Sequence, residues 1–477
     1  ARSCGPMPSQ PPHCLPCLHA AEMAEPVEEL PRDEFELQVR WALSGEVLGW
    51  LHVAPYETGE ALRLALAPEP GAACSLRLLL DGRALGDAET LADAGARAGG
   101  ALELLQSRPC LLLTASADSS ALCWEAEAGR CLFLLQGHGD AVGTASFSPD
   151  GLLAVTGSAD NTARIWSTRS GACLASCRGH ADGVCAAAFA PDGQLLATAS
   201  HDGTAMVWDV ADGNCKCVLA GHKGGVYDIA FAQDGCFVAT ASEDFTARLW
   251  CPRTGDCSAA LEGHHAGVES VAFSPEGKLL ITASLDTDAR IWEVATGSCL
   301  LTLQGHEDSL GSALFSPDGR LTATVSDDRT ARVWSVETGQ CCAVLREHAE
   351  VVAAGAFSPD GRALATASHD GRARLWGAGD GGLRWASSRH PDGSPLYAVA
   401  FSPDGALVAA AAECGCWLLD AANGACLRSL GGHRNAVYCV SFCWAPAVTP
   451  ARLAGALRRC SEASGGSAGH GQQGVGG

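Results

Sequence analysis

The sequence predicts a mainly β protein built from repeated units of four short antiparallel strands, preceded by a small α+β module. Three observations support this prediction. A pattern of histidine, tryptophan and turn residues recurs every 42 residues, each unit divides into short apolar runs closed by turn residues, and residues 35–106 lack the repeat. Hydrophobic residues make up 47% of the chain and charged residues 18%, so most of its 477 residues should fold.

The 42-residue period is carried by histidine and tryptophan positions. Histidines recur at this interval from His138 to His390, and His433 follows after 43 residues. Tryptophans keep the same interval from Trp124 to Trp376. A fixed period of this length indicates a repeat architecture.

The unit that begins at Gly179 shows the pattern within one period. An apolar run ends at Phe189 and is followed by a Pro-Asp-Gly turn at 191–193. A second run covers 195–200, and after a further turn a third covers 204–208. A fourth run leads to the next Gly-His pair. Each run has the length of one strand, so the unit is four short antiparallel strands.

This Gly-His to Trp-Asp pattern resembles the WD40 family of β-propellers. The resemblance covers about residues 110–442 and implies a ring of four-stranded blades around a channel. It also implies a buried network in each blade that joins a loop His, a strand Thr, a turn Asp and the Trp. The sets stand at constant offsets from the histidine: His138, Thr156, Asp160, Trp166; His180, Thr198, Asp202, Trp208; His222, Thr240, Asp244, Trp250; His264, Thr282, Asp286, Trp292; His306, Thr324, Asp328, Trp334; and His348, Thr366, Asp370, Trp376.

A histidine beside a carboxylate and a hydroxyl is also the composition of a catalytic triad. Six copies at one spacing favour a structural network instead. The sequence has no P-loop, dinucleotide-binding glycine fingerprint, His-Glu-x-x-His motif or isolated nucleophile elbow. We therefore expect no enzymatic activity and no cofactor.

Counting strands predicts eight blades. Residues 111–135 supply three strands, seven full units follow, and 437–442 supplies one more, which would complete the first blade and close the ring. A seven-bladed ring that leaves the flanking pieces unused is the alternative. In the last full unit Ala410, Cys414 and Asp420 stand where Thr, Asp and Trp are expected, so we predict that this blade lacks the network.

Residues 35–107 resemble the ubiquitin-like β-grasp. Two alternating runs flank Ser44-Gly45, a helix-compatible stretch covers 58–67, and a Leu-Asp-Gly-Arg-x-Leu turn at 80–85 precedes a final strand at 101–105. The chain continues beyond this strand, so the domain is expected to dock a partner and not to be conjugated. The resemblance implies an apolar recognition patch at Leu43, Leu79 and Leu105.

Cysteines also follow the period, every 42 residues from Cys131 to Cys341 and again at Cys426. They would lie in different blades, too far apart for disulfides, so the 24 cysteines indicate reduced thiols. Cys14 and Cys17, with flanking histidines, have zinc-ligand spacing. No second cysteine pair lies nearby, so we expect a Pro-rich disordered tail and no bound metal.

The expected segments are a Pro/Cys-rich and then acidic disordered tail over 1–34, the ubiquitin-like domain over 35–107, the propeller over 108–443 and a disordered Gly/Ser-rich tail over 444–477. The net charge of −22 repels phosphate backbones and anionic membranes, and no apolar run reaches 18 residues. Neither nucleic acid nor membrane is an expected partner. The N-terminus lacks a secretory pattern, so we expect a cytoplasmic protein, with the nucleus as an alternative location.

The resulting expectation is a non-catalytic interaction scaffold, monomeric within a larger complex. Family resemblance implies two versions of this role. One is an adaptor in the ubiquitin or proteasome pathway. The other is an assembly factor like the Notchless-type ribosome biogenesis proteins, which pair a ubiquitin-like domain with an eight-bladed propeller.

Three of the four tyrosines share one repeat position, four residues before the Phe that ends the first strand. In WD40 proteins this position, and the residue between Ser and Asp of the Ser-x-Asp turn, lie at the top mouth of the channel. Aromatic anchors among carboxylates favour a peptide that carries Arg or Lys. Solvated loop tips with chance tyrosines are the alternative. The predicted top-face residues are Tyr227, Tyr397, Tyr438, His201, Glu243, Glu269, Leu285, Asp327, His369 and Glu413.

Overall fold

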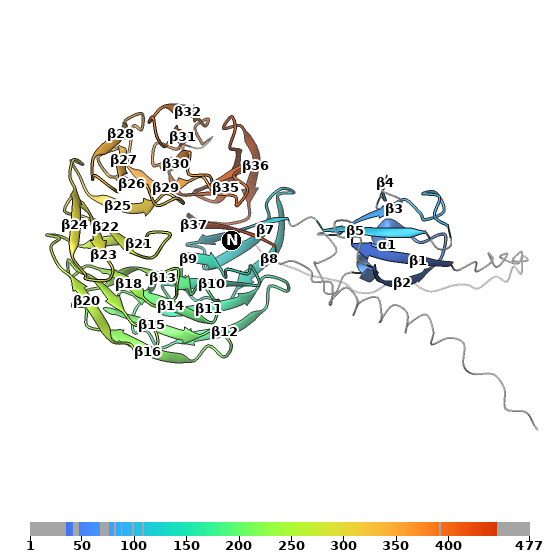
Figure 1. The fold of residues 1–477 in the computed structure, drawn as a ribbon, viewed down its shortest axis with the longest axis horizontal. Helices are drawn as coiled ribbons and strands as arrows, with labels where there is room; N and C mark the ends of the chain where they lie inside the picture. Colours follow the sequence, from blue (N-terminus) through green and yellow to red (C-terminus); the bar gives the residue numbers. More distant parts are fainter. Residues whose placement is uncertain are drawn as a thin grey trace, which may run out of the picture.

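The computed structural model describes residues 35–41, 47–66, 76–80, 83–86, 88–97, 100–106, 109–390 and 393–445 (Figure 1). The predicted tail over 1–34 and residues 446–477 of the predicted C-terminal tail lie outside the described residues. In the described part of the chain, no helix is long and apolar enough to cross a membrane.

The N-terminal module is a five-stranded mixed sheet with one helix. Its elements are β1 (Phe35–Trp41), β2 (Val47–Val53), α1 (Gly59–Leu66), β3 (Leu76–Leu80), β4 (Arg83–Ala84) and β5 (Ala101–Gln106). The strand order is β2-β1-β5-β3-β4, and β1 runs parallel to β5. Leu62 and Leu66 of α1 join Leu37 and Leu102 in one buried core. Thr58 begins the helix because its hydroxyl accepts the backbone N–H of Ala61 at 3.3 Å.

The strands from Cys110 to Trp444 form eight four-stranded antiparallel sheets in the described residues. The first four sheets, in ring order, are β37 (Val437–Trp444), β6 (Cys110–Ser116), β7 (Ser120–Glu125), β8 (Arg130–Gln136); β9 (Val142–Phe147), β10 (Leu153–Ser158), β11 (Thr162–Ser167), β12 (Cys173–Arg178); β13 (Val184–Phe189), β14 (Leu195–Ser200), β15 (Thr204–Asp209), β16 (Cys215–Ala220); and β17 (Val226–Phe231), β18 (Val238–Ser242), β19 (Ala247–Trp250), β20 (Cys257–Leu261). The other four are β21 (Val268–Phe273), β22 (Leu279–Ser284), β23 (Ala289–Glu293), β24 (Cys299–Leu303); β25 (Leu310–Phe315), β26 (Leu321–Ser326), β27 (Ala331–Ser335), β28 (Cys341–Leu345); β29 (Val352–Phe357), β30 (Ala363–Ser368), β31 (Ala373–Gly377), β32 (Leu383–Ala386); and β33 (Leu396–Phe401), β34 (Leu407–Ala412), β35 (Gly415–Asp420), β36 (Cys426–Gly431).

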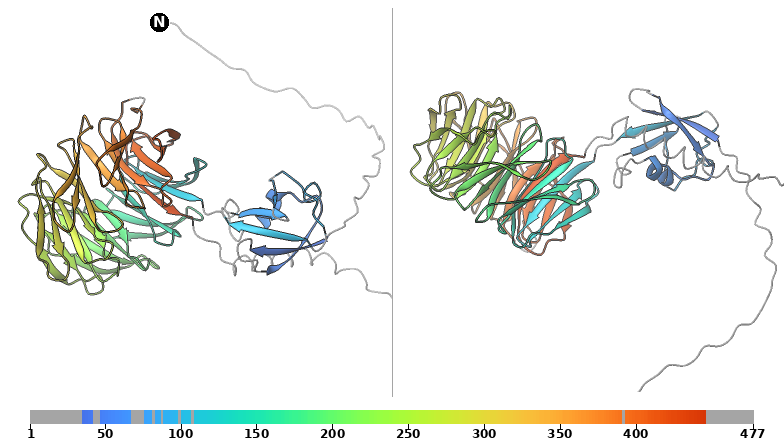
Figure 2. Two further views of the ribbon diagram at one scale, coloured as in Figure 1. Left: turned by 45° about the horizontal axis from the view of Figure 1, so that its top comes forward. Right: turned by 90° about the horizontal axis from the view of Figure 1, so that it is seen from below.

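The sheets are arranged around a common centre, with the first strand of each sheet inward and the fourth at the rim (Figures 1 and 2). First strands of successive sheets lie side by side, and β37 lies beside both β33 and β9. Second strands such as β14 are buried along almost their whole length, because neighbouring sheets pack on both faces. Fourth strands such as β16 leave most side chains exposed or half-buried.

The Pro-Asp-Gly turns explain why the inner hairpins form where the sequence predicts them. Between β13 and β14, Asp192 accepts the backbone N–H of Gln194 at 2.9 Å. Gly193 has a φ of +70°, a left-handed conformation that suits glycine. Its N–H donates to the carbonyl of Ala190 at 2.8 Å, which closes the turn.

The C-terminal strand completes the sheet that the N-terminal end of the ring begins. β37 pairs antiparallel with β6, from Val437 opposite Ser116 to Trp444 opposite Cys110. The strand count predicts this pairing, although β37 extends through Trp444, one residue beyond the predicted boundary at 443. Pairing with β37 covers the edge of β6 that would otherwise be open.

Candidate functional site

The structure brings together all four residues of each of the six predicted networks. In the set of His264, Nδ1 lies 2.8 Å from Oδ2 of Asp286, and Nε2 lies 2.8 Å from Oγ1 of Thr282. The indole N–H of Trp292 donates to the same threonine oxygen at 2.9 Å. The other five sets repeat these contacts.

In the set of His264 the donors and acceptors are consistent with one tautomer of the histidine. Because the Thr282 hydroxyl accepts the indole N–H, it can donate its own proton to Nε2 of His264. The single N–H proton of the neutral His264 ring is then on Nδ1, which donates it to Asp286. The carboxylate also accepts the backbone N–H of His265 at 2.8 Å. The threonine has no exposed surface, so its hydroxyl is closed to solvent and its hydrogen bonds hold the strands of the blade together.

A seventh network was not predicted from the sequence. Thr114 Oγ1 lies 2.8 Å from Nε2 of His433, whose Nδ1 lies 3.1 Å from Oδ2 of Asp118. The indole N–H of Trp124 donates to Thr114 at 3.0 Å. Subtracting one 42-residue period from the first predicted set leads to the same Thr, Asp and Trp, which is the signal that would have found them. The histidine is supplied from the other end of the ring.

The sheet of β33–β36 contains no such network, and its alignment differs from the prediction. Leu407 pairs with Asp420 as Leu195 pairs with Asp209, so Leu419, and not Asp420, occupies the position of the tryptophan. The reason is a shorter turn after β34, in which Cys414 has a φ of +67°. Trp417 instead stacks on the ring of His390, with centroids 4.6 Å apart.

The predicted top-face residues come from seven neighbouring sheets and lie at the same end of those sheets. Each lies near the start of a first strand or just after a second strand. His201 packs edge-on against Tyr227 with ring centroids 5.7 Å apart. On the other side, Tyr397 packs edge-on against His369 and Tyr438, at 5.5 Å in both contacts. Each contact joins residues of two neighbouring sheets, so the aromatic groups bridge blades.

Carboxylates lie between the two aromatic groups. Burial, followed by the charges of Asp327, Asp228 and Glu243, raises the pKa of Glu269. Burial and the nearby Asp308 likewise raise the pKa of Asp327. These effects indicate that the acids repel one another, because like charges disfavour the ionised form.

The remaining predicted top-face residues differ in exposure and in their contacts. Leu285 is 43% exposed and Tyr438 is 45% exposed. Glu243 accepts the backbone N–H of Gly225 at 3.3 Å, and burial and the charge of Glu413 raise the pKa of Tyr397. Asp228, which the sequence did not point to, follows Tyr227 in β17, and burial raises its pKa to about 6.

The WD domain, G-beta repeat family (WD40) matches six segments of the chain: 129–167, 171–209, 213–251, 255–293, 297–335 and 339–377. The chain contains six WD40 repeats. Together with the four-stranded sheets, they support a WD40 β-propeller. No curated protein sequence matches the chain. Proteins with WD40 repeats are generally non-catalytic and bind other proteins, which agrees with the buried networks of this chain.

The networks predict a loss of WD40 propeller stability on mild acidification. Burial lowers the pKa of the seven network histidines below the ordinary 6.5. The fold therefore holds them neutral, whereas the unfolded chain takes up protons below pH 6.5, so stability falls as pH falls. The melting temperature should drop by roughly 5–10 °C between pH 7.0 and 5.5, measured by circular dichroism. A melting temperature that stays constant over this range would contradict the neutral assignment.

The predicted patch of the N-terminal module is described only in part. Leu79 is half-buried and pairs with Glu103 of β5. Leu105 lies opposite Arg77 in the same pair of strands, and its side chain lies outside the described residues, as does Leu43. The patch therefore stays a prediction.

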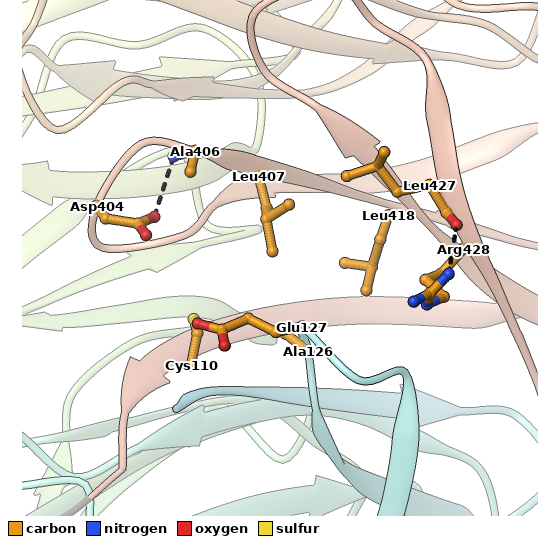
Figure 3. Close-up of a pocket in the computed structure, with 9 residues that line it drawn as sticks. All are labelled: Cys110, Ala126, Glu127, Asp404, Ala406, Leu407, Leu418, Leu427 and Arg428. Carbon is orange, nitrogen blue, oxygen red and sulfur yellow. Dashed lines mark hydrogen bonds between the residues drawn. The ribbon is translucent and has the colours of Figure 1, made fainter. Parts of the chain in front are cut away.

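A cavity of about 330 Å³ lies at the seam between the last sheet and the closing sheet of the WD40 propeller (Figure 3). Leu407 and Leu418 form an apolar wall, and burial raises the pKa of the Cys110 thiol to about 12. Two of the polar groups that line it are bonded within the chain: Asp404 accepts the N–H of Ala406, and Arg428 donates to the carbonyl of Leu427. We assign no ligand to this cavity.

The described cysteines are all free thiols. Within the same residues no group of three or more His, Cys, Asp or Glu side chains could hold a metal ion. Cys14 and Cys17, which have zinc-ligand spacing, lie outside the described residues.

Proposed function

We propose that this chain is a non-catalytic scaffold whose WD40 propeller binds a basic peptide segment across its top face. The observation that supports this most directly is the row of carboxylates between two aromatic groups. Glu243, Glu269 and Asp327 come from three successive sheets, and none of them forms an ion pair within the described residues. A cationic side chain would relieve their repulsion.

The two aromatic groups suit the ends of such a segment. Tyrosine contributes a large contact area and loses little conformational entropy on binding. Tyr227 stands beside Glu243 and Glu269, whose charges add to burial in raising its pKa. Tyr397 has the same relation to Glu413. An Arg or Lys of the partner could therefore stack on a tyrosine ring and pair with a carboxylate at either end.

The charge-reversal variant E243K/D327K tests this proposal, because both side chains are exposed and their removal leaves the buried networks intact. Partners captured on the wild-type protein are identified by mass spectrometry and the principal one is titrated by calorimetry. Its dissociation constant should rise by about tenfold or more, with a weaker salt dependence.

The matched control is D212K/E337K. It reverses two exposed acids in the turns that follow β15 and β27, at the end of these sheets opposite the top face. It makes the same change in net charge and should leave the dissociation constant within about twofold. Equal affinity of both variants and the wild type would show that the partner does not use the top face.

We infer further that the ring has eight blades and that residues 35–106 are a ubiquitin-like domain that docks a second partner. The eight sheets and the β37–β6 pairing support the first inference, and the helix between β2 and β3 with parallel β1 and β5 supports the second. Two roles fit such a scaffold: an adaptor in the ubiquitin–proteasome pathway, or a complex-assembly factor of the Notchless type. Fluorescence imaging separates them, since a nucleolar signal favours the assembly factor and a diffuse cytosolic signal the adaptor.

A further inference from the structure

The outer rim of the propeller carries one cysteine at the start of most fourth strands. Cys131 and its equivalents at 42-residue intervals up to Cys341, together with Cys426, are all solvent-exposed. The WD40 networks do not involve them. Because they share one backbone position, differences in their reactivity must come from the side chains around them.

In five sheets an arginine stands two residues before the network tryptophan, on the same side of the third strand, and in four of these sheets the fourth strand also carries the exposed cysteine. The arginines of these four sheets are Arg164, Arg248, Arg290 and Arg332. The Nη1 of Arg164 donates to the sulfur of Cys173 at 4.0 Å, and that of Arg248 to the sulfur of Cys257 at 3.9 Å. A guanidinium beside an exposed thiol favours the thiolate form.

The guanidinium charge of these four arginines has no carboxylate partner in the described part of the chain. Within the described residues none of the four forms an ion pair, and the Nε of each is buried without a hydrogen-bond partner. The guanidinium of Arg248 is instead held over the ring of Trp250, 6.0 Å from its centroid. Such a group favours an anion as its missing partner.

The remaining sheets lack one half of this pair. Leu122, Met206 and Trp417 replace the arginine in the sheets of Cys131, Cys215 and Cys426. In the sheet of β29–β32 the arginine is present as Arg374, but it forms an ion pair with Asp370 at 2.8 Å, and Leu383 replaces the cysteine. Each of the four arginines without an ion pair therefore lies in a sheet that has an exposed cysteine at this position, whereas three other exposed cysteines have no such arginine.

We propose that the Arg–Cys pairs of the rim, represented by Arg164–Cys173 and Arg248–Cys257, are sites of S-thiolation by an anionic disulfide of the glutathione type. The arginine attracts a carboxylate of the reagent and stabilises the attacking thiolate. The thiolate sulfur forms a bond to one sulfur of the disulfide, whose S–S bond breaks. The leaving thiolate takes up the proton that the cysteine has released, so one mixed disulfide and one free thiol result and no further oxidant is needed.

The experiment treats the full chain with glutathione disulfide at pH 7.4 and follows each cysteine by quantitative mass spectrometry. Cys173 and Cys257 should react roughly three- to tenfold faster than Cys131, Cys215 and Cys426, the equivalents without arginine. These three serve as controls inside the same molecule. Equal rates at all five positions would overturn the proposal.

Two reciprocal variants separate the effect of the arginine from local packing. R164M should slow Cys173 to the rate of Cys215, and M206R should raise Cys215 to the rate of Cys173, with unchanged melting temperatures. If R164M impairs folding, M206R decides alone, because arginine already occupies this position in neighbouring sheets. Failure of M206R to accelerate Cys215 would contradict the role of the arginine.

A neutral reagent, bis(2-hydroxyethyl) disulfide, tests the preference for an anion. The difference between Cys173 and Cys215 should be smaller with this reagent than with glutathione disulfide, because the carboxylates are absent. An equal difference with both reagents would overturn the assignment of an anionic disulfide.

Discussion

A chain truncated after Asn435 should lose much of the stability of the propeller. Removing β37 exposes the edge of β6 and uncovers Leu112 and Leu113, which have no exposed surface in the intact ring. Val437 and Val440 of β37 are buried as well, and each such side chain contributes about 1.5–3 kcal/mol. We expect a loss of at least about 5 kcal/mol, measured by urea denaturation.

The control is a chain truncated after Ala445, which keeps β37 and removes only the C-terminal residues beyond the described part. It should unfold like the full chain. The shorter protein should also associate through its open edge, visible as dimers or larger species in light scattering. If both truncations had the same midpoint and remained monomeric, β37 would not close the ring.

Asp286→Ala should destabilise the propeller by about 1–3 kcal/mol in urea denaturation. The carboxylate accepts hydrogen bonds from His264 Nδ1 and from the backbone N–H of His265, both at 2.8 Å. Alanine leaves the histidine N–H buried without its acceptor, and the desolvation of that group is no longer compensated. The loss should appear in the midpoint with little change in the slope of the transition.

Cys414→Ala is the matched control, because it changes the corresponding turn in the sheet that lacks a network. Cys414 is exposed, and no network histidine, threonine or tryptophan bonds to it. Its replacement should change stability by less than about 0.5 kcal/mol. Comparable losses in the two variants would mean that the network of His264 does not stabilise its blade.

The repeat period and the offsets within it could be derived from the sequence because each unit has the same local pattern. A histidine, a threonine 18 residues later and an aspartate 22 residues later meet in one hairpin, and neighbouring units only repeat that geometry. In the seventh network, the local pattern does not reveal which histidine takes part. Its histidine is His433 and its threonine is Thr114, and only closure of the ring brings residues 319 positions apart into contact.

In the sheet of β33–β36, counting residues along the sequence assigns the wrong residue to the tryptophan position. A shorter turn after β34 shifts the pairing, so that Leu419 takes the tryptophan position that counting assigns to Asp420. Counting along the chain assumes constant turn lengths, whereas register follows from which backbone groups pair. The compensating contact between Trp417 and His390 depends on that shifted register.

The amino-acid sequence by itself determined the repeat unit, the residues of six networks and the positions that gather at one end of the strands, because all of these depend on local periodicity. The tertiary structure decided which of them touch. His201 meets Tyr227, and Glu269 lies near Asp327, because neighbouring sheets pack at the angle that closing a ring imposes. Contacts between sheets depend on how apolar faces pack around the centre, and no pattern within one 42-residue unit contains that information.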